Sequence, residues 1–329
     1  MDNLTHTMAG VVLAKAGFSR KYGPGTTLAL VVASNLPDVD TILSLVGGEM
    51  GILDRRTLTH SLVGLPVLAA MTAWIFHRIY RNIPWAVFFR LSLLGLVIHV
   101  FLDLINSFGV VLLYPFSLHR YELAWVFIID LAIWGALIVP LSLSLIPRWR
   151  KRRQSLCQIS LALFVVYVGI CGVARGRASS ALDRVASHLG VGADFSYVFP
   201  EPLGPHRFRG VLRVGDEYRL YLIRLPSGLA EPRGSVRTDA NVPALRAIRE
   251  AESARRIEWF FKAPVWKVLD HERIEAPPGM PVEDGQENVE AEVYDLRFRS
   301  LVLGGMGGPF ITYRFRKSSM GIEGPLRER

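Results

Sequence analysis

The sequence predicts a mainly α-helical protein, a polytopic membrane bundle followed by a small β-rich α+β domain, and three observations support this. Half of the 329 residues are hydrophobic. The mean hydropathy is +0.29, which is high for a soluble enzyme. Nearly all long apolar runs lie in residues 1–175, whereas residues 176–329 have the composition of an ordinary soluble domain. Because the length allows about two domains, we expect a membrane-embedded domain over 1–175 and a soluble domain over 176–329.

Apolar runs of about the length needed to cross a bilayer follow one another in the first part of the chain. They cover residues 26–47, 61–76, 86–106, 123–146 and 156–174. A transmembrane helix needs about 20 residues, within a range of about 17–25. A shorter run at 7–18 suits a partly inserted helix. We therefore expect about five to six membrane segments, and the alternative is a buried helical bundle in a soluble protein.

The excess of basic residues is explained by membrane topology better than by nucleic acid binding. The net charge is +9. If the segments alternate across the membrane, one side carries eleven basic residues: Lys15, Arg20, Lys21, Arg78, Arg81, Arg90, Arg148, Arg150, Lys151, Arg152 and Arg153. The other side carries three: Arg55, Arg56 and Arg120. The positive-inside rule places the richer side in the cytoplasm. We expect a multi-pass protein of the bacterial inner membrane with an extracytoplasmic C-terminal domain and no nucleic acid partner.

Acidic and histidine residues lie inside or at the ends of these apolar runs. They are His6, Asp38, Asp40, His60, His99, Asp103 and Asp130. An Asp at the centre of a membrane helix costs about 2.5–3.5 kcal/mol on insertion scales, so seven such groups need a stabilising partner. The charge distribution places six or all seven of them toward the outer side. We therefore expect them to neutralise one another around divalent metal ions.

The spacing of these residues suits metal ligands. His99 and Asp103 are four residues apart and share one face of a helix. Asp38 and Asp40 follow a proline that breaks the helix, so their carboxylates can bind one ion or bridge two. His60 lies between two hydroxyl residues that can cap a helix or orient the ring. A set of His and Asp without cysteine favours a catalytic ion, with zinc, manganese or iron as candidates.

Each candidate ligand also has a structural interpretation. His6 could be a surface histidine, Asp38 and Asp40 could form a turn with a helix cap, and His60 could be an interfacial residue. His99 and Asp103 could be a hydrogen-bonded pair within one helix. Asp130 could form an ion pair with a basic group on a neighbouring helix. Their joint placement on one side favours a metal site. For Asp130 both interpretations stay open.

The second domain has patterns of strands and one helix, but no catalytic constellation. Residues 210–225 alternate as half-buried strands do, and 290–300 and 309–316 also favour strands. Residues 243–261 favour a single helix with a proline in its first turn. These segments predict a small α+β domain.

Four short motifs resemble, in order, those of a known family. They are Asp2-Asn3-Leu4-Thr5-His6, Leu36-Pro37-Asp38-Val39-Asp40, Leu58-Thr59-His60-Ser61 and His99-Val100-Phe101-Leu102-Asp103. This order resembles the inner-membrane-associated metal-dependent hydrolases, the LexA-regulated, YdjM-like membrane-bound hydrolases. That family is distantly similar to zinc-dependent phospholipase C and the S1/P1 nucleases. The resemblance covers residues 1 to about 135, and Asp130 departs from it in lacking the proline that commonly follows.

The resemblance implies an integral membrane hydrolase with one to three divalent ions, zinc first. Such ions lower the pKa of a bound water and polarise a phosphoryl or acyl group. We expect Asp38, Asp40 and Asp103 to be catalytic, with one carboxylate acting as general base. The expected substrate is a lipid-derived or lipid-linked ester at the outer face, a phosphoester first. The alternatives are an ion transporter and a non-catalytic sensor or scaffold with a structural metal.

Overall fold

The long helix α8 (Arg153–Leu189) carries the chain from one folding unit into a second in the computed structural model. The structure describes residues 1–23, 25–42, 51, 53–190, 192–273, 287–302, 311–318 and 321–327. The first unit comprises Met1–Leu43, Asp54–Ala178 and Pro200–Phe208; the second comprises Ser44–Leu53, Ser179–Phe199 and Arg209–Arg329. The domain boundary predicted at 175/176 lies inside α8.

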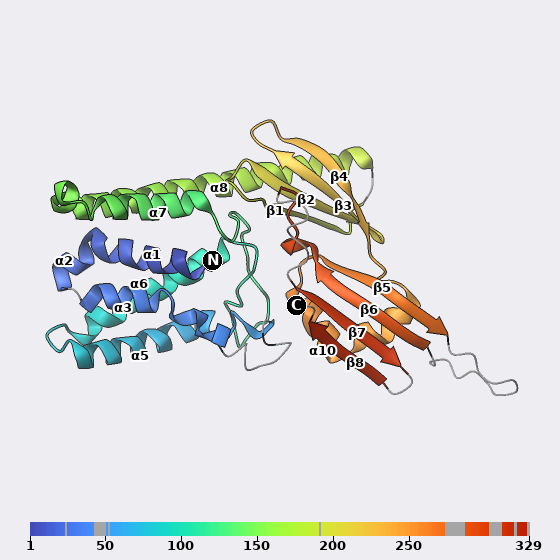
Figure 1. Cartoon of the computed structure of the whole chain (residues 1–329), viewed down its shortest axis with the longest axis horizontal. Coiled ribbons are helices and arrows are strands. Elements are labelled where there is room, and N and C mark those ends of the chain that lie inside the picture. Colours follow the sequence, from blue (N-terminus) through green and yellow to red (C-terminus); the bar gives the residue numbers. More distant parts are fainter. Residues whose placement is uncertain are drawn as a thin grey trace, which may run out of the picture. The chain divides into compact units, whose positions relative to one another are not determined.

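Helices that lie side by side with roughly parallel axes form the first unit (Figure 1). They are α1 (Asn3–Leu13), the π-helical turn η1 (Ala14–Phe18), α2 (Ser19–Tyr22), α3 (Gly25–Ala33), α5 (Gly64–Ile79), α6 (Trp85–Leu104), α7 (Leu131–Leu143) and α8. The 3₁₀ turns η2 (Leu36–Val39), η4 (Leu58–His60) and η5 (Pro147–Arg152) lie between them.

The prediction of five to six membrane segments is wrong. Among the described residues, two helical stretches are long and apolar enough to cross a membrane, Trp85–Leu104 and Pro147–Leu189. The other apolar runs form shorter helices of 9 residues in α3, 16 in α5 and 13 in α7. At 1.5 Å per residue these reach about 14–24 Å, which is less than the roughly 30 Å of a hydrocarbon core.

Local signals shorten two of these helices. The side chain of Asp130 caps α7 by accepting hydrogen bonds from the backbone N–H groups of Ala132 and Ile133, at 2.9 and 3.1 Å, so the residues before it stay outside the helix. Pro37 has no N–H and lies in the first turn of η2, after α3 has ended at Ala33. Part of the run 26–47, residues 43–47, lies outside the described residues. An apolar run is therefore longer than the helix it contains.

Two glycines bring α1 and α6 onto α3. A Cβ added at Gly10 would lie 3.1 Å from the carbonyl oxygen of Leu30, and one added at Gly95 would lie 2.9 Å from Cβ of Ala33. Small residues allow such close backbone approach between helices. His6 precedes Gly10 by one helical turn, and His99 follows Gly95 by one turn. The glycine contacts thus fix the positions of two predicted ligands relative to α3.

The second unit contains two four-stranded antiparallel sheets. One has the order β1 (Phe195–Pro200), β2 (Arg207–Val214), β3 (Glu217–Arg224), β4 (Leu229–Arg237). The other has the order β5 (Pro264–Arg273), β6 (Glu287–Asp295), β7 (Thr312–Ser318), β8 (Gly321–Arg327). The short helices are η6 (Pro243–Leu245), α9 (Arg246–Glu250), α10 (Glu252–Phe260) and η7 (Leu296–Phe298). A mainly α class is therefore wrong for this chain, because two sheets accompany the helical unit.

Some local predictions in this unit missed a turn. The alternating run 210–225 is a hairpin of β2 and β3, which turns at Gly215, where φ is +58° and a glycine fits best. The helix predicted over 243–261 is interrupted at Ala251, whose backbone is extended. The run 290–300 contains the end of β6, and the described part of 309–316 contains the first part of β7.

Candidate metal centre

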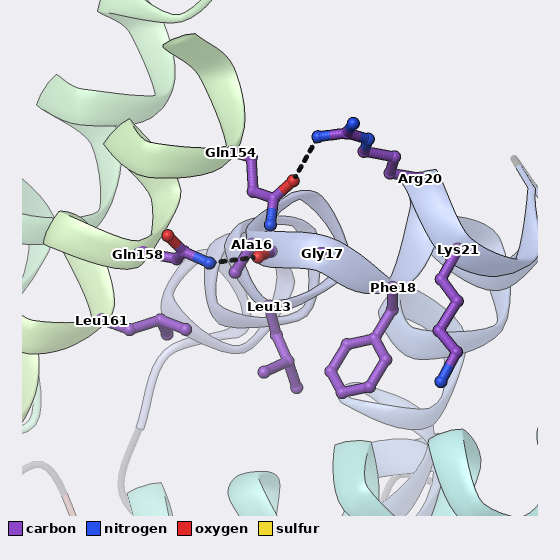
Figure 2. A pocket seen from close by; sticks show the side chains of 9 residues that line it. All are labelled: Leu13, Ala16, Gly17, Phe18, Arg20, Lys21, Gln154, Gln158 and Leu161. Carbon is purple, nitrogen blue, oxygen red and sulfur yellow. Dashed lines mark hydrogen bonds between the residues drawn. The ribbon is translucent and has the colours of Figure 1, made fainter.

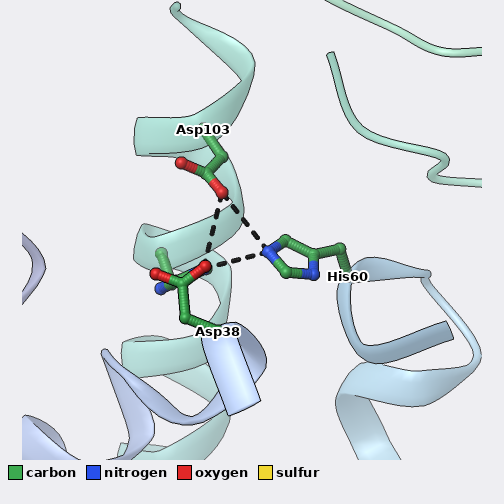
Figure 3. A group of neighbouring side chains, drawn as sticks. Asp38, His60 and Asp103 are labelled. Atoms are coloured by element: carbon green, nitrogen blue, oxygen red, sulfur yellow. Dashed lines mark hydrogen bonds and ion pairs between the residues drawn. The ribbon is translucent and has the colours of Figure 1, made fainter. Parts of the chain in front are cut away.

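Four buried acidic and histidine side chains of the first unit converge. They are Asp38 on η2, His60 on η4, and His99 and Asp103 on α6. One ligand atom from each lies within 4.8 Å of the others. Figure 3 shows Asp38, His60 and Asp103 pointing toward one another from their three separate elements. The i, i+4 pair on α6 supplies two of the four ligand atoms, and two helix-breaking turns supply the others.

The distances suit one divalent ion. The Nε2 atoms of His60 and His99 are 3.1 Å apart. Asp103 Oδ2 lies 3.3 Å from His60 Nε2 and 3.6 Å from His99 Nε2. Asp38 Oδ1 is 4.0 Å from His99 Nε2. Two ligands of a tetrahedral zinc ion, each bound at about 2.0–2.1 Å, are roughly 3.3–3.4 Å apart. The ligand atoms of His60, His99 and Asp103 therefore have nearly the spacing of a tetrahedral coordination shell, and Asp38 lies farther out.

Hydrogen bonds at the opposite ring nitrogens leave both Nε2 atoms as acceptors. Nδ1 of His99 lies 2.8 Å from the carbonyl oxygen of Ser34, so Nδ1 carries the proton. The hydroxyl of Thr59 donates to Asp40 at 3.0 Å and so accepts from Nδ1 of His60 at 2.9 Å. The two Nε2 atoms then face each other beside two carboxylates. A cation between them, whether a metal ion or a proton on His60, would satisfy these lone pairs.

Asp40, predicted as a ligand and catalytic residue, lies behind His60. Its Oδ2 accepts from the backbone N–H of Arg56 at 2.8 Å and lies 3.4 Å from Nδ1 of His60. Its Oδ1 lies 3.6 Å from Nε of Arg55. Carboxylates in this position orient a ligating histidine and fix its tautomer. The geometry therefore supports a positioning role for Asp40.

The charges around His60 make the site attractive to a cation. Burial lowers the pKa of His60, but the hydrogen bonds and negative charges of Asp103 and Asp40 outweigh it and raise the pKa above its ordinary value. Burial raises the pKa of Asp40, and the hydrogen bonds and charge from His60, with those from Arg56 and Thr59, outweigh it and lower the pKa. Asp40 therefore stays ionised beside the ring, and His60 is surrounded by negative charge.

His6 has the properties of a further ligand. Its ring stacks on His99 with a centroid distance of 3.9 Å, and its Nε2 lies 3.5 Å from Asp103 Oδ1. Both ring nitrogens are buried without a hydrogen-bond partner, as is Asp103 Oδ2. A buried polar group without a partner costs about 1–3 kcal/mol. Burial, with the charge of the nearby N-terminal amine, lowers the pKa of His6, so the ring is neutral and able to coordinate. These buried lone pairs fit a divalent ion.

The structure does not bring Asp130 into this group. Among the described residues, the four with ligand atoms within 4.8 Å of one another do not include it. Asp130 caps α7 and accepts a hydrogen bond from the hydroxyl of Tyr167, at 2.8 Å to Oδ2 and 3.1 Å to Oδ1. These contacts support the structural interpretation that the sequence left open.

Sequence reasoning missed the groups that hold Asp103. Nη2 of Arg56 lies 3.0 Å from Asp103 Oδ1, and the amide of Asn106 donates to the same oxygen at 3.5 Å. The amine of Met1 also contacts Oδ1. These contacts turn Oδ2 toward the two histidines. Asn106 lies three residues after Asp103, a spacing that places the two side chains on neighbouring turns. Nothing in the sequence distinguishes the buried Arg56 from the half-buried Arg55 beside it.

Comparisons with known proteins place the first unit in a membrane protein family. The profile described as "YdjM inner membrane protein" matches residues 1–178, which include all the candidate ligands. "Uncharacterized protein YfhP" of Bacillus subtilis (strain 168) is 27% identical over 124 residues, 36% of this chain and 38% of that protein. The match thus spans well under half the length of this curated relative. No solved structure matches the chain. The YdjM part of the resemblance is confirmed, and the similarity to hydrolases, phospholipase C and nucleases receives no support.

Proposed function

The chain belongs to the YdjM inner membrane protein family, and from this premise we propose that it is a membrane-bound, metal-dependent hydrolase. One observation carries the proposal: the Nε2 atoms of His60 and His99 converge with the carboxylates of Asp38 and Asp103. Mixed nitrogen and oxygen ligands with near-tetrahedral spacing favour zinc. His6 completes the set, either on the same ion or on a second one.

The residues around the centre divide into candidate metal ligands and one candidate general base. A bound divalent ion supplies Lewis acidity, which lowers the pKa of water and polarises an ester. Asp103 is fully buried and held by Arg56, so it suits an anchoring ligand. Asp38 is the most exposed of the four at 7% and has the longest distance to a histidine. Asp38 therefore best suits a carboxylate that accepts a proton from water.

The distribution of charge supports an orientation with the centre at the outer face. Arg78 and Arg81 precede α6, and the basic turn η5 precedes α8. The positive-inside rule favours the cytoplasm for both basic beginnings, and α7, although shorter than a full span, would then return the chain between them. His99 and Asp103 lie in the last two turns of α6, toward the outer side. The second unit then follows α8 on that side.

A lipid-derived or lipid-linked ester is the substrate class that these features favour. The centre lies near the end of a candidate membrane span, where headgroup esters are found. Arg55, with 24% of its side chain exposed, lies 3.4 Å from Asp38 and places a positive charge beside the candidate base. A phosphoester is therefore the first candidate bond, and a carboxylic ester or amide the second.

Metal analysis of the full chain in detergent tests the centre. We expect tightly held zinc in the wild type and its loss in His60→Ala and Asp103→Ala, because each removes a ligand. His119→Ala is the matched control, since His119 lies exposed in a loop. Wild-type zinc content in the two ligand variants would contradict the proposal. Circular dichroism checks that all variants fold.

A substrate screen tests the activity. Phospholipids and lipid-linked phosphates are offered to the wild type and to Asp38→Asn. We expect zinc to stay bound in this variant and hydrolysis to fall by about 100-fold or more, because a general base contributes roughly 10²–10⁴-fold. A zinc-loaded wild type that cleaves none of these phosphoesters, carboxylic esters or amides would argue for the transporter or scaffold alternative.

A further inference from the structure

A pocket separate from the metal centre lies between α8 and the segment that joins α1 to α2 (Figure 2). Its volume is about 710 Å³, within the roughly 300–1,000 Å³ range of small-molecule sites. The residues that line it are Leu13, Ala16, Gly17, Phe18, Arg20, Lys21, Gln154, Gln158 and Leu161. None of them is acidic, and none belongs to the metal centre.

The lining divides into an apolar part and a basic rim. Leu13 is buried, and Phe18 and Leu161 are half-buried. Arg20 and Lys21 are exposed at the rim. An apolar surface bordered by two cations is complementary to an amphiphile with an anionic headgroup. The hydrocarbon would contact the apolar side chains, and the phosphate would contact the basic ones.

Two side-chain amides of α8 hold the rim in place. Arg20 Nη1 donates to Gln154 Oε1 at 3.3 Å, as Figure 2 shows. Gln158 Nε2 donates to the carbonyl oxygen of Ala16 at 3.0 Å. Ala16 lies in η1, where the chain kinks at Gly17, whose backbone is non-helical (φ 163°, ψ −32°). Distant segments are therefore joined by specific hydrogen bonds around the pocket.

The pocket lies at the basic end of a candidate membrane span. Gln154, Gln158 and Leu161 belong to the first three turns of α8, directly after the basic turn η5. By the positive-inside rule this end faces the cytoplasm. Basic pockets between helices on this side of a membrane bind anionic lipid headgroups. The position and the charge thus favour the same occupant.

We propose that this pocket binds one anionic phospholipid of the cytoplasmic leaflet. Arg20, beside Gln154, contacts its phosphate, Lys21 adds positive charge on the other side of the rim, and Leu13, Phe18 and Leu161 contact the first part of an acyl chain. A free inorganic anion would use the two cations but leave the apolar surface unused. The site is independent of the proposed hydrolase activity, because it shares no residue with the metal centre.

Lipid titration of the full chain in neutral detergent, followed by native mass spectrometry, tests the proposal. The probes are dioleoylphosphatidylglycerol and dioleoylphosphatidylcholine. We expect the wild type to prefer phosphatidylglycerol by about tenfold or more. The double variant Arg20→Gln/Lys21→Gln should lose roughly 30-fold in affinity for it, because each basic group near a headgroup contributes about fivefold.

A matched control removes two charges elsewhere on the same expected side. Arg78→Gln/Arg81→Gln should bind phosphatidylglycerol within about twofold of the wild type, since neither residue lines the pocket. An equal loss in this control would show diffuse attraction and overturn the proposal. Equal binding of both lipids by the wild type would overturn it as well.

Further experiments distinguish lipid binding from binding of a free anion and from loss of binding through misfolding. Leu161→Gln keeps every charge and should still weaken phosphatidylglycerol binding by about fivefold, because an acyl contact is lost. If the double charge variant does not fold, Lys21→Gln alone and Leu161→Gln decide the outcome. Displacement of the lipid by millimolar inorganic phosphate, with Leu161→Gln unaffected, would identify a free-anion site and contradict the proposal.

Discussion

Buried charges occur in both units, but their hydrogen-bonding differs. In the second unit, Asp295 accepts from the backbone N–H groups of Lys262, Ala263 and Arg297, at 2.8, 3.0 and 2.9 Å. Its Oδ2 also lies 3.1 Å from Nε of Arg297, whose Nη2 donates to the carbonyl oxygen of Phe260 at 2.9 Å. The acceptor positions of this carboxylate are thus used within the fold.

The candidate metal centre has lone pairs that the described residues leave unused. Asp103 Oδ2 and both ring nitrogens of His6 are buried without a hydrogen-bond partner. Two equally buried aspartates therefore differ in their hydrogen bonding. The carboxylate oxygens of Asp295 accept hydrogen bonds within the fold, whereas Asp103 Oδ2 accepts none from the described residues. Satisfaction of the lone pairs, more than burial or charge, distinguishes a structural carboxylate from a candidate ligand.

The largest effect on stability is expected at Asp295. Asp295→Ala leaves Arg297 buried without its carboxylate, which should lower the free energy of unfolding of the second unit by about 3–5 kcal/mol. The zinc content should not change. Chemical denaturation followed by tryptophan fluorescence measures the loss. Glu217→Ala on β3 is the control, because its ion pair with Arg219 is partly exposed and its removal should have little effect. If Asp295→Ala lowered the free energy of unfolding only slightly, Asp295 would not be the structural carboxylate that this comparison requires.

The role of Asp40 is tested by a smaller change. Asp40→Asn keeps an acceptor for Thr59 and the N–H of Arg56 but removes the charge behind His60. Zinc affinity should fall by about 10–100-fold while zinc still binds, because the carboxylate orients a ligand. Competition with a chelator of known affinity measures this. Complete loss of zinc, equal to that of His60→Ala, would show that Asp40 is itself a ligand.

The next largest effect on stability is expected at the glycine contact between α3 and α6. Gly95→Ala places a methyl group 2.9 Å from Cβ of Ala33, so we expect a loss of about 1–3 kcal/mol in stability from overpacking. Zinc affinity should fall too, since His99 follows one turn later. Gly135→Ala on α7 is the control, because no atom lies within 4 Å of the added methyl. This control should be neutral or stabilised by up to about 1 kcal/mol. Similar thermal shifts in the two variants would argue against close packing at Gly95.

The smallest effect is expected at Asp130. Asn is as good a helix cap as Asp, so Asp130→Asn should keep α7 nearly as stable. Zinc content should equal that of the wild type, as measured by metal analysis. A loss of zinc would make Asp130 a ligand after all and extend the centre beyond the four converging residues.

The sequence predicted the relations that a single helix or turn determines. The i, i+4 spacing of His99 and Asp103 put both on one face of α6. It did not predict which carboxylate faces the histidines, because this depends on Arg56 and Thr59, whose contacts arise from packing between segments. Helix lengths were also overpredicted. Asp130 begins α7 eight residues into a continuous apolar run, and hydropathy alone does not show a cap.

The break after α3 also determines the protonation of a residue on another helix. In a continuous helix the carbonyl oxygen of Ser34 would accept from the N–H of residue 38. Here that N–H donates to Asn35, and the Ser34 oxygen accepts from Nδ1 of His99. No side-chain substitution at position 34 removes a backbone carbonyl. The tautomer of His99 is therefore encoded in the backbone path around Pro37, and it tolerates changes in the side chain at position 34 as long as that path is kept.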